Sequence, residues 1–389
     1  MSGIKEIIKK GLVVSDDITD KLIVQHLRNG EFRKYKSPKR KAIYETIILT
    51  DEQKKEIDQL YKTYYGEKIP YTWHRHFTAF TGKFDKNYIP ELLFIPEFEH
   101  FMNYNSSYVE AFADKNVTPM IAKMGGVLSP NVFLSCTEGI ATDGSNIFAE
   151  AEVNEFLRDI GEAFIKPSVD TGSGKGCMVI DVHGGIDSIS GKTVKELLSQ
   201  FGRNYVIQER LICHPSIRKI YPNSVNTFRV ITYRWKDSIN VMPVIMRIGQ
   251  GESTVDNAHA GGLFIAIDDD GVLHRTAFTE FKDTFTVHPD TNLAFEGYKI
   301  ENFDKVLIAA KKLHSLVPQI GVYHWDFTIN TNGIPVLIEA NTECGGIWVA
   351  QMAHGCGVFG DLTPEILLWT GKMKRMSKSK RQEFAFGNL

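Results

Sequence analysis

The spacing of apolar residues changes along the chain and divides it into regions. In residues 1–70, apolar side chains such as Ile57 and Leu60 recur at helical spacing among Lys and Glu, which predicts amphipathic helices. Residues 71–110 are rich in aromatics and contain the turn-forming stretches YIPE and FIPE, so we expect an irregular but packed segment there. We interpret residues 1–113 as an N-terminal helical, accessory region.

Strand patterns dominate the rest of the chain. Short strands and helices alternate up to residue 205, and the stretch SGKTVKELLSQF in this part reads as a capped amphipathic helix. Longer apolar strands follow from residue 206. DDDG and NTNG are typical of hairpin turns, and one helix, NFDKVLIAAKKLHSL, interrupts the strands. The basic residues 371–389 show no periodic face. We therefore expect that segment to be a loose, solvated tail.

One predicted strand ends on two polar side chains. IPVLIEAN carries Glu339 and Asn341, which are two residues apart and so point to the same face. The strand before the NTNG turn carries Asp326, which can face them across an antiparallel pair. These oxygen donors suit Mg²⁺ held partly by nucleotide phosphates. The alternative is that Asp326 caps a strand end and Glu339 is a solvated edge residue.

A glycine-rich loop follows a second predicted strand. In FIKPSVDTGSGKG the strand ends at Lys166, and the loop contains Gly172, Gly174 and Gly176. Glycines let the backbone approach phosphate oxygens closely, and the lysine would place a positive charge over them. The stretch lacks the GxxxxGK[ST] pattern of a Walker loop. The alternative is a turn with a surface lysine.

A third stretch, YVIQERLICHP, is an apolar strand that runs into Gln208 and Glu209. Such a strand can offer backbone groups to the edge of an adenine, while the carboxylate takes the ribose hydroxyls. The alternative is an ordinary core strand. The position of the stretch between the glycine loop and the proposed metal hairpin favours nucleotide binding.

These pieces, in this order, resemble the ATP-grasp superfamily, and more narrowly its sugar-transfer-associated branch. The resemblance covers residues 114 to about 360 and runs through DKNVTPMIAKMGGVLSP, FIKPSVDTGSGKG, VIQERLICHPSI, YPNSVNTFRVITY, VIMRIGQGESTVDNAHAGGLFIAID and HWDFTINTNGIPVLIEANTECGG. It implies an α+β, ATP-grasp fold in which two α+β subdomains sandwich the nucleotide. Residues 114–205 would be the lid subdomain with the glycine-rich loop, and 206–370 the C-terminal subdomain with the Mg²⁺ site.

The resemblance also implies roles for single residues in binding ATP and Mg²⁺. Lys115 and Lys166 match positions near the α- and β-phosphates. The stretch from Gln208 and Glu209 to Leu211 matches the adenine site. The positions that match the Mg²⁺ ligands are Asp326, Glu339 and Asn341.

Further positions match the catalytic part of the family's site. Arg229 and Arg247 match basic residues that face the γ-phosphate or an acyl-phosphate intermediate. Asn257 and the following HAGG stretch, with His259, match a loop near the transferred phosphate. In EANTECGG, Glu343 and Cys344 depart from the smaller or variable residues that the family leads us to expect, so the specificity for the acceptor stays open.

Composition and charge exclude several classes of protein. The 389 residues carry a net charge of -2, which gives no indication of nucleic-acid binding, and no apolar run approaches the length needed to span a bilayer. The N-terminal sequence lacks a signal-peptide pattern, so we expect a cytoplasmic protein. Five cysteines without a CxxC pair fit reduced thiols and disfavour a zinc site.

Two other candidates are weaker. In WHRHF, His74 and His76 would lie on one face of a strand, but no third metal donor lies near them in the sequence. Cys344 would be a nucleophile only with a base beside it, and none is identifiable. We expect packing roles for these residues.

The activity that the resemblance implies is ATP-dependent ligation of a carboxylate to an amine through an acyl phosphate, with release of ADP and phosphate. ATP and Mg²⁺ are the expected cofactors, and a small-molecule or glycan carboxylate and an amine are the expected substrates. The branch name suggests surface polysaccharide or glycan modification. The alternatives are an ATP-dependent kinase on the same fold and a non-catalytic nucleotide-binding protein.

Overall fold

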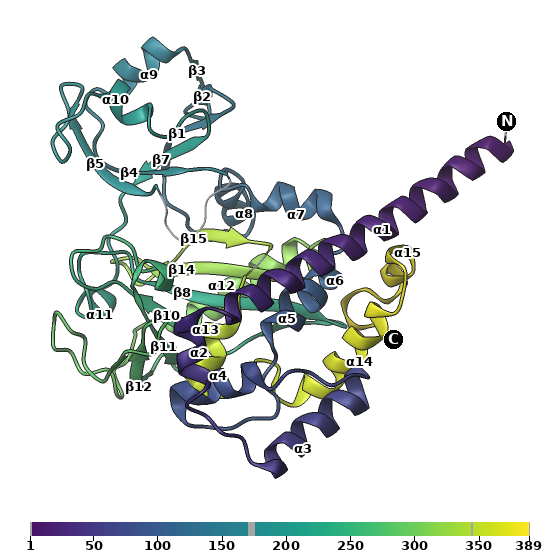
Figure 1. The fold of residues 1–389 in the computed structure, drawn as a ribbon. Coiled ribbons are helices and arrows are strands. Elements are labelled where there is room, and N and C mark those ends of the chain that lie inside the picture. Colours follow the sequence, from purple (N-terminus) through teal and green to yellow (C-terminus); the bar gives the residue numbers. More distant parts are fainter. Residues whose placement is uncertain (1, 170–175, 344, 389) are drawn as a thin grey trace.

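The computed structural model describes residues 2–169, 176–343 and 345–388, and shows an α+β protein with two antiparallel sheets (Figure 1). The smaller sheet forms a separate lobe with its own apolar core. Its strands lie in the order β3-β2-β1-β7-β4-β5-β6. They are β1 (Val132–Thr137), β2 (Ile140–Thr142), β3 (Ile147–Phe148), β4 (Gly161–Pro167), β5 (Met178–His183), β6 (Ile186–Asp187) and β7 (Tyr205–Glu209).

Two short helices complete the smaller lobe, α9 (Glu150–Phe156) and α10 (Val194–Leu198). The side chain of Thr193 accepts a hydrogen bond from the backbone N–H of Glu196, and the Glu196 side chain accepts one from the backbone of Thr193. This reciprocal pair satisfies two donors at the start of α10. The predicted capped helix is therefore confirmed, although it is shorter than the sequence pattern.

The larger sheet has eight strands in the order β13-β12-β11-β10-β8-β14-β15, with β9 paired to β8. They are β8 (Thr227–Trp235), β9 (Ser238–Val241), β10 (Ile245–Ile248), β11 (Leu263–Ile267), β12 (Leu273–Phe278), β13 (Thr284–Phe285), β14 (Val322–Ile329) and β15 (Pro335–Asn341). Both predicted hairpins are present, because β11 pairs with β12 and β14 with β15. Gly333 in the second turn has a φ of +72°, a conformation that glycine adopts without strain.

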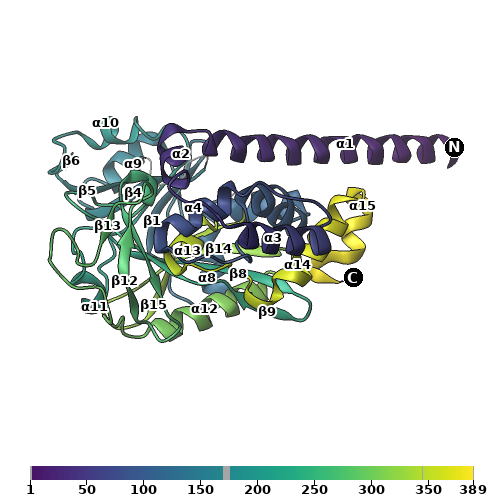
Figure 2. The same ribbon diagram turned by 60° about the horizontal axis from the view of Figure 1, so that its bottom comes forward.

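Alternating side chains give the larger sheet two buried faces. Phe228, Trp325 and Phe327 pack in one core with the inner side of helix α12 (Phe303–Leu316). Ile231 and Val322 face the opposite way, into a core shared with the N-terminal helices. Figure 2 shows α12 on the other side of β8 and β14 from those helices. A strand buried on both faces reads as a continuous apolar run, as these strands do.

The N-terminal helices cover the second face. They are α1 (Ser2–Tyr35), α2 (Pro38–Tyr44), α3 (Asp51–Leu60), the π-helical turn η1 (Tyr61–Tyr65), α4 (Thr72–Thr81), and the continuous run of α5 (Glu91–Leu93), η2 (Phe94–Glu99) and α6 (His100–Met102). The amphipathic helices predicted before residue 70 are confirmed. Helix α1 extends far beyond the rest of the molecule, with its N-terminal end at the tip (Figure 2).

The segment 71–110 differs from expectation. It is packed but largely helical, and His74 and His76 lie on helix α4 instead of a strand face. The His74 ring lies 5.9 Å from the ring of Tyr88, and its Nε2 is 3.1 Å from the Lys86 carbonyl oxygen. Aromatic and β-branched residues favour strands only where they pack on a sheet surface, and here they fill a helical layer.

The remaining helices connect or close these layers. They are α7 (Ser106–Ala113), α8 (Thr118–Met124), α11 (Pro215–Arg218), η3 (Ala258–Ala260), α13 (Trp348–His354), η4 (Gly360–Leu362), α14 (Thr363–Lys374), α15 (Lys378–Arg381) and η5 (Gln382–Gly387). Among the described residues, no helix is both long and apolar enough to cross a membrane. The domain boundaries drawn from the sequence stay predictions.

The expectation of a loose basic tail is wrong for residues 371–388. Arg381 is buried, and its guanidinium donates to the Met373 carbonyl oxygen and forms an ion pair with Asp20 on α1. The indole N–H of Trp369 donates to the carbonyl oxygen of Phe384. These contacts could not be predicted from the basic composition of the segment. A buried arginine can attach a segment to the rest of the protein even where the segment has no periodic apolar face.

Candidate functional site

Strand register brings two of the predicted oxygen donors together. Asp326 on β14 is the direct cross-strand partner of Glu339 on β15, and a register shift follows between Asp326 and Phe327. Two positions along the hairpin, His324 pairs with Asn341. Asp326 and His324 are two residues apart, so both face the side of the sheet that carries the N-terminal helices. The sequence-based expectation that Asp326 faces Glu339 is confirmed.

Two arginines enclose the Asp326 carboxylate. Arg229 lies opposite Asp326 on β8 and donates through Nε to Oδ1 at 2.7 Å. Arg247 on β10 approaches Oδ2 through Nη2 at 2.9 Å. Burial raises the pKa of Asp326, but the two guanidinium groups outweigh it and lower the pKa below its usual value. The carboxylate is therefore ionised and holds both arginines in place.

Asp256 completes this network, and the sequence analysis missed it. Its Oδ2 accepts hydrogen bonds from the backbone N–H and the hydroxyl of Thr227, at 2.8 and 2.5 Å. The Thr227 hydroxyl in turn accepts from Arg247 Nη2 at 2.7 Å. Burial lowers the pKa of Arg247, but Asp256 and Asp326 raise it above its usual value. In sequence, an aspartate in a polar loop reads as a turn residue.

Two lysines face this cluster, Lys166 from the smaller lobe and Lys115 from the connection between α7 and α8. Lys115 Nζ lies 3.7 Å from Glu339 Oε1 and 3.4 Å from the Pro167 carbonyl oxygen. Lys166, at the end of β4, is 6% exposed, and its Nζ lies 3.5 Å from the Ile338 carbonyl oxygen. Burial lowers the pKa of Lys166, while Glu339 opposes that shift. The two lysines and the carboxylates of the larger sheet thus meet at one place.

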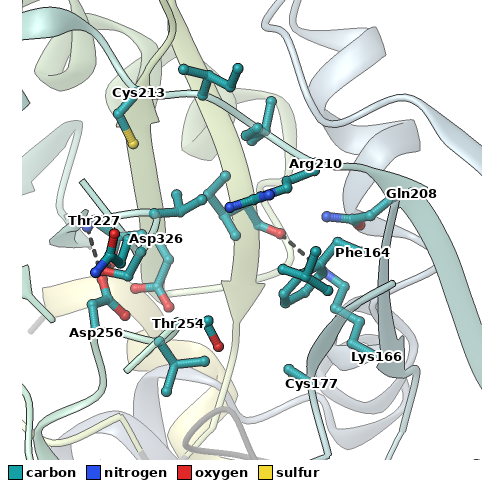
Figure 3. A pocket seen from close by; sticks show the side chains of 18 of the residues that line it. Phe164, Lys166, Cys177, Gln208, Arg210, Cys213, Thr227, Thr254, Asp256 and Asp326 are labelled. Carbon is teal, nitrogen blue, oxygen red and sulfur yellow. Dashed lines mark hydrogen bonds between the residues drawn. The ribbon is translucent and has the colours of Figure 1, made fainter. Parts of the chain in front are cut away.

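A cavity of about 310 Å³ lies between the two sheets at this point (Figure 3). Its walls come from both lobes and from the β7–α11 connection. The predicted site residues that line it are Lys115, Lys166, Gln208, Glu209, Leu211, Arg247, Asn257, Asp326 and Glu339. Lining residues that the sequence analysis did not select include Phe164, Cys177, Arg210, Arg218, Asn223, Thr227 and Asp256.

The other predicted residues are placed differently. Arg229 and Asn341 do not line the cavity, although Arg229 contacts Asp326 and Asn341 follows Glu339 on β15. Gly176 is described, with a φ of +79°, and is also absent from the cavity wall. Gly172 and Gly174 lie outside the described residues, as does Cys344.

The donor set fits a hard cation such as Mg²⁺. Asp326 and Glu339 supply two carboxylates on adjacent strands, and Asn341 supplies an amide oxygen two residues further along. Among the described residues, no three His, Cys, Asp or Glu side chains are arranged so that they alone could hold a metal ion. A metal here would therefore share its carboxylates with Arg229, Arg247 and Lys115, and would take other ligands from phosphates or water.

The chain is similar to several solved structures at low identity. These include an N5-carboxyaminoimidazole ribonucleotide synthetase bound to ADP (12% identity, 63% of this chain and 48% of that chain, TM-score 0.39). An L-amino acid ligase from Bacillus licheniformis gives 14% identity, 70% and 50% coverage, and a TM-score of 0.36. A D-alanine–D-alanine ligase from Bacillus anthracis gives 14% identity, 70% and 69% coverage, and a TM-score of 0.36.

The chain spans about half the length of the synthetase and of the amino acid ligase. No curated protein matches it. The sequence profile described as sugar-transfer associated ATP-grasp matches residues 94–364, well over half of the chain. The match begins inside the helices that the sequence analysis treated as accessory. The chain belongs to the sugar-transfer-associated ATP-grasp family.

Proposed function

We propose that the protein is an ATP-dependent carboxylate–amine ligase that works through an acyl phosphate and releases ADP and phosphate. The observation that carries this proposal is the charge arrangement at one cavity between the two sheets. Lys115, Lys166 and Arg247 line it together with Asp326 and Glu339. Such a set suits a polyphosphate chain and the charge that develops during phosphoryl transfer.

The proposed roles follow from position and charge. Lys115 and Lys166 bind the α- and β-phosphates, and the wall formed by Gln208, Glu209 and Leu211 accepts the adenosine. Asp326, Glu339 and Asn341 hold Mg²⁺, which neutralises phosphate charge when it is bound. The cavity lining also includes apolar side chains, Phe164, Val179 and Ile338 among them, that can pack against an adenine.

The arginines stabilise the reacting groups. A carboxylate is a poor acyl donor, because oxide is a poor leaving group, and transfer of the γ-phosphoryl group turns it into an acyl phosphate. Asp326 fixes both arginines before any substrate arrives. Arg247, which lines the cavity, then meets the developing negative charge without reorganisation. Asn257, on the loop at the cavity wall, is placed to orient the transferred group. An amine then displaces phosphate.

The substrates that we propose are a small-molecule or glycan carboxylate and an amine. The glycan context is supported only by the name of the family. Incubation of the protein with ATP, Mg²⁺ and a pool of cell metabolites, followed by mass spectrometry, tests the activity. A ligase gives a product whose mass is that of an acid plus an amine less one water, together with ADP.

Two outcomes of that experiment would contradict the proposal. A metabolite that gains one phosphoryl group, with no amine required, would identify a kinase. Tight ATP binding with no product and no ADP from any pool would identify a nucleotide-binding protein without turnover. A variant with Glu296→Gln serves as the matched control, since Glu296 is exposed, lies 3.9 Å from Arg275 and does not line the cavity.

A further inference from the structure

The loop between β10 and β11 carries two residues of the cavity wall. Asp256 and Asn257 line the cavity, and Asp256 accepts two hydrogen bonds from Thr227. The loop then turns back on itself, since the backbone N–H of Gly262 donates to the Asn257 carbonyl oxygen at 3.0 Å. A Cβ atom at Gly262 would lie 2.4 Å from the Asp256 carbonyl oxygen, so only glycine fits there. Residues 256–262 therefore form one compact turn, and a contact that holds its far end also holds the cavity wall.

His259, within this turn, is bound by a glutamate from another loop. Its Nδ1 lies 2.7 Å from Oε2 of Glu280, which follows β12. Burial raises the pKa of Glu280, but hydrogen bonds from His259 and Arg40 outweigh it and lower the pKa below its usual value. Glu280 is therefore an ionised carboxylate, which can only accept, so the His259 ring donates to it through Nδ1.

The other oxygen of Glu280 is bound by the N-terminal helices. Arg40 on α2 donates through Nη2 to Oε1 at 2.7 Å, and the two side chains are only 11% and 12% exposed. The Arg40 guanidinium also lies over two aromatic rings, with Cζ 5.3 Å from the centroid of Tyr35 and 5.8 Å from that of Trp348. Arg40, Glu280 and His259 thus form a continuous chain of charged contacts from α2 to the turn.

Trp348 on α13 adds an apolar contact along the same path. Its ring lies 5.6 Å from the ring of His259. Trp348 and Ala258 both pack against the core that the N-terminal helices share with the larger sheet. The region that we interpreted from the sequence as accessory is therefore attached to the loop that forms part of the cavity wall.

We propose that Arg40 and Glu280 are positioning residues for the proposed ligase reaction, because they hold the 256–262 turn in place. The turn in turn keeps Asp256 and Asn257 in the cavity wall. A displacement of an orienting group by about 1 Å can cost on the order of 10²-fold in rate. This inference rests on the proposed ligase activity, since it assigns the two residues a role in that reaction.

Backbone amide hydrogen exchange tests the positioning without turnover. The N–H groups of residues 260–262 donate to carbonyl oxygens within the turn. Arg40→Gln and Glu280→Gln should each speed exchange there on the order of 10-fold, because a turn that has lost its outer contact opens more often. Arg40→Lys keeps a positive charge beside Glu280 and should restore part of the protection.

A matched control separates positioning from a general loss of stability. Arg75 on α4 also belongs to the N-terminal helices, where its Nε donates to the Ile47 carbonyl oxygen at 2.7 Å and its guanidinium lies over the ring of Tyr44. Arg75→Gln should lower the thermal midpoint of unfolding, because it removes that hydrogen bond. It should leave exchange at residues 260–262 unchanged.

Trapping with hydroxylamine tests whether the position of the turn matters for the reaction, because hydroxylamine converts an acyl phosphate into a hydroxamate. With ATP, Mg²⁺ and a pool of cellular carboxylic acids, the rate at saturating ATP should fall on the order of 10-fold in Arg40→Gln and in Glu280→Gln. KM for ATP should stay unchanged, because the proposed adenosine contacts lie elsewhere in the cavity. The double variant should be no slower than either single variant, since the two residues act through one contact. Arg75→Gln should keep the wild-type rate.

Three results would overturn the assignment. They are unchanged exchange in Arg40→Gln and Glu280→Gln, an equal rise in exchange in Arg75→Gln, and faster exchange with an unchanged rate of hydroxamate formation. If the wild type forms a hydroxamate but exchange does not respond to Arg40 or Glu280, the positioning role is wrong and the proposed function stands. If the wild type forms no hydroxamate, the proposed function fails and the role in the reaction fails with it, while faster exchange in the two variants still shows that Arg40 and Glu280 hold the turn.

Discussion

Glu339 is the residue whose replacement separates chemistry from folding most cleanly. It is part-exposed at the edge of the charged cluster and has Lys115 as its ion-pair partner, at 3.7 Å. Glu339→Gln keeps the shape of the side chain but removes the charge proposed to hold Mg²⁺. We expect turnover to fall by on the order of 10² to 10³, with an unchanged circular dichroism spectrum. Glu296→Gln, which removes an exposed carboxylate that does not line the cavity, should keep full turnover. Full activity in Glu339→Gln would contradict the metal assignment.

Asp326 should matter for folding as well. Asp326→Asn leaves the Arg229 and Arg247 guanidinium groups without their shared counter-charge, and breaking a buried pair in this way costs about 3–5 kcal/mol. Urea unfolding measures the loss. Because the pKa of Asp326 is lowered in the fold, its contribution is present above the unfolded value and disappears as the pH falls below it. The unfolding free energies of wild type and variant should therefore become more similar at acidic pH. A difference that does not change with pH would contradict the proposed ion pairs of Asp326 with the two arginines.

Single site residues could be predicted from the sequence where residue type and spacing along one strand were sufficient. They could not be predicted where the interaction partner lies far away in the sequence. Glu339 was found because i and i+2 share a strand face. Asp256 was missed, because its two contacts with Thr227 join a loop to a strand 29 positions away, and no local pattern reports such a contact.

The strands and hairpins of the larger sheet followed from the sequence, because turn residues and apolar runs are local signals. Helix α4 did not follow. Its aromatic residues suit either a strand or a buried helix, and only the packing of the N-terminal layer against the sheet decides between them.

Helix α12 is tied to the sheet by a histidine that must stay neutral. His314 Nδ1 lies 2.7 Å from the Thr232 hydroxyl and Nε2 lies 2.9 Å from the Ile320 carbonyl oxygen. Burial lowers the pKa of His314 to about 3, so the unfolded chain binds a proton near pH 6.5 that the fold excludes. Its contribution is full above that pH and is lost as the pH falls.

The unfolding free energy of the wild type should fall between pH 6 and pH 4. In His314→Gln this fall should be smaller, by roughly 1.4 kcal/mol for each pH unit. Urea unfolding at a series of pH values measures both slopes. An identical pH dependence of the unfolding free energy in wild type and variant would show that folding does not lower the pKa of His314.

At the scale of the whole molecule, Asn103 joins the N-terminal region to the sheet. Its side-chain amide donates to the carbonyl oxygens of Val322 and Thr342, and its oxygen accepts from the backbone N–H groups of Gly321 and Val322. Asn103→Ala leaves four buried backbone groups without partners, so we expect a loss of at least about 3 kcal/mol. Asn105→Ala, which removes no such bonds, is the control. Equal unfolding free energies of the two variants in urea would contradict the proposed role of Asn103.

The proposed ligase activity requires that a carboxylate be phosphorylated in the cavity between the two sheets. Hydroxylamine tests this most directly, because it traps an acyl phosphate as a hydroxamate and replaces the amine substrate. The protein would be incubated with ATP, Mg²⁺, hydroxylamine and a pool of cellular carboxylic acids, and the products read by mass spectrometry. We predict ADP and one hydroxamate with the wild type, and on the order of 10²- to 10³-fold less of both with Glu339→Gln. ADP formed together with a phosphorylated alcohol and no hydroxamate would contradict the account.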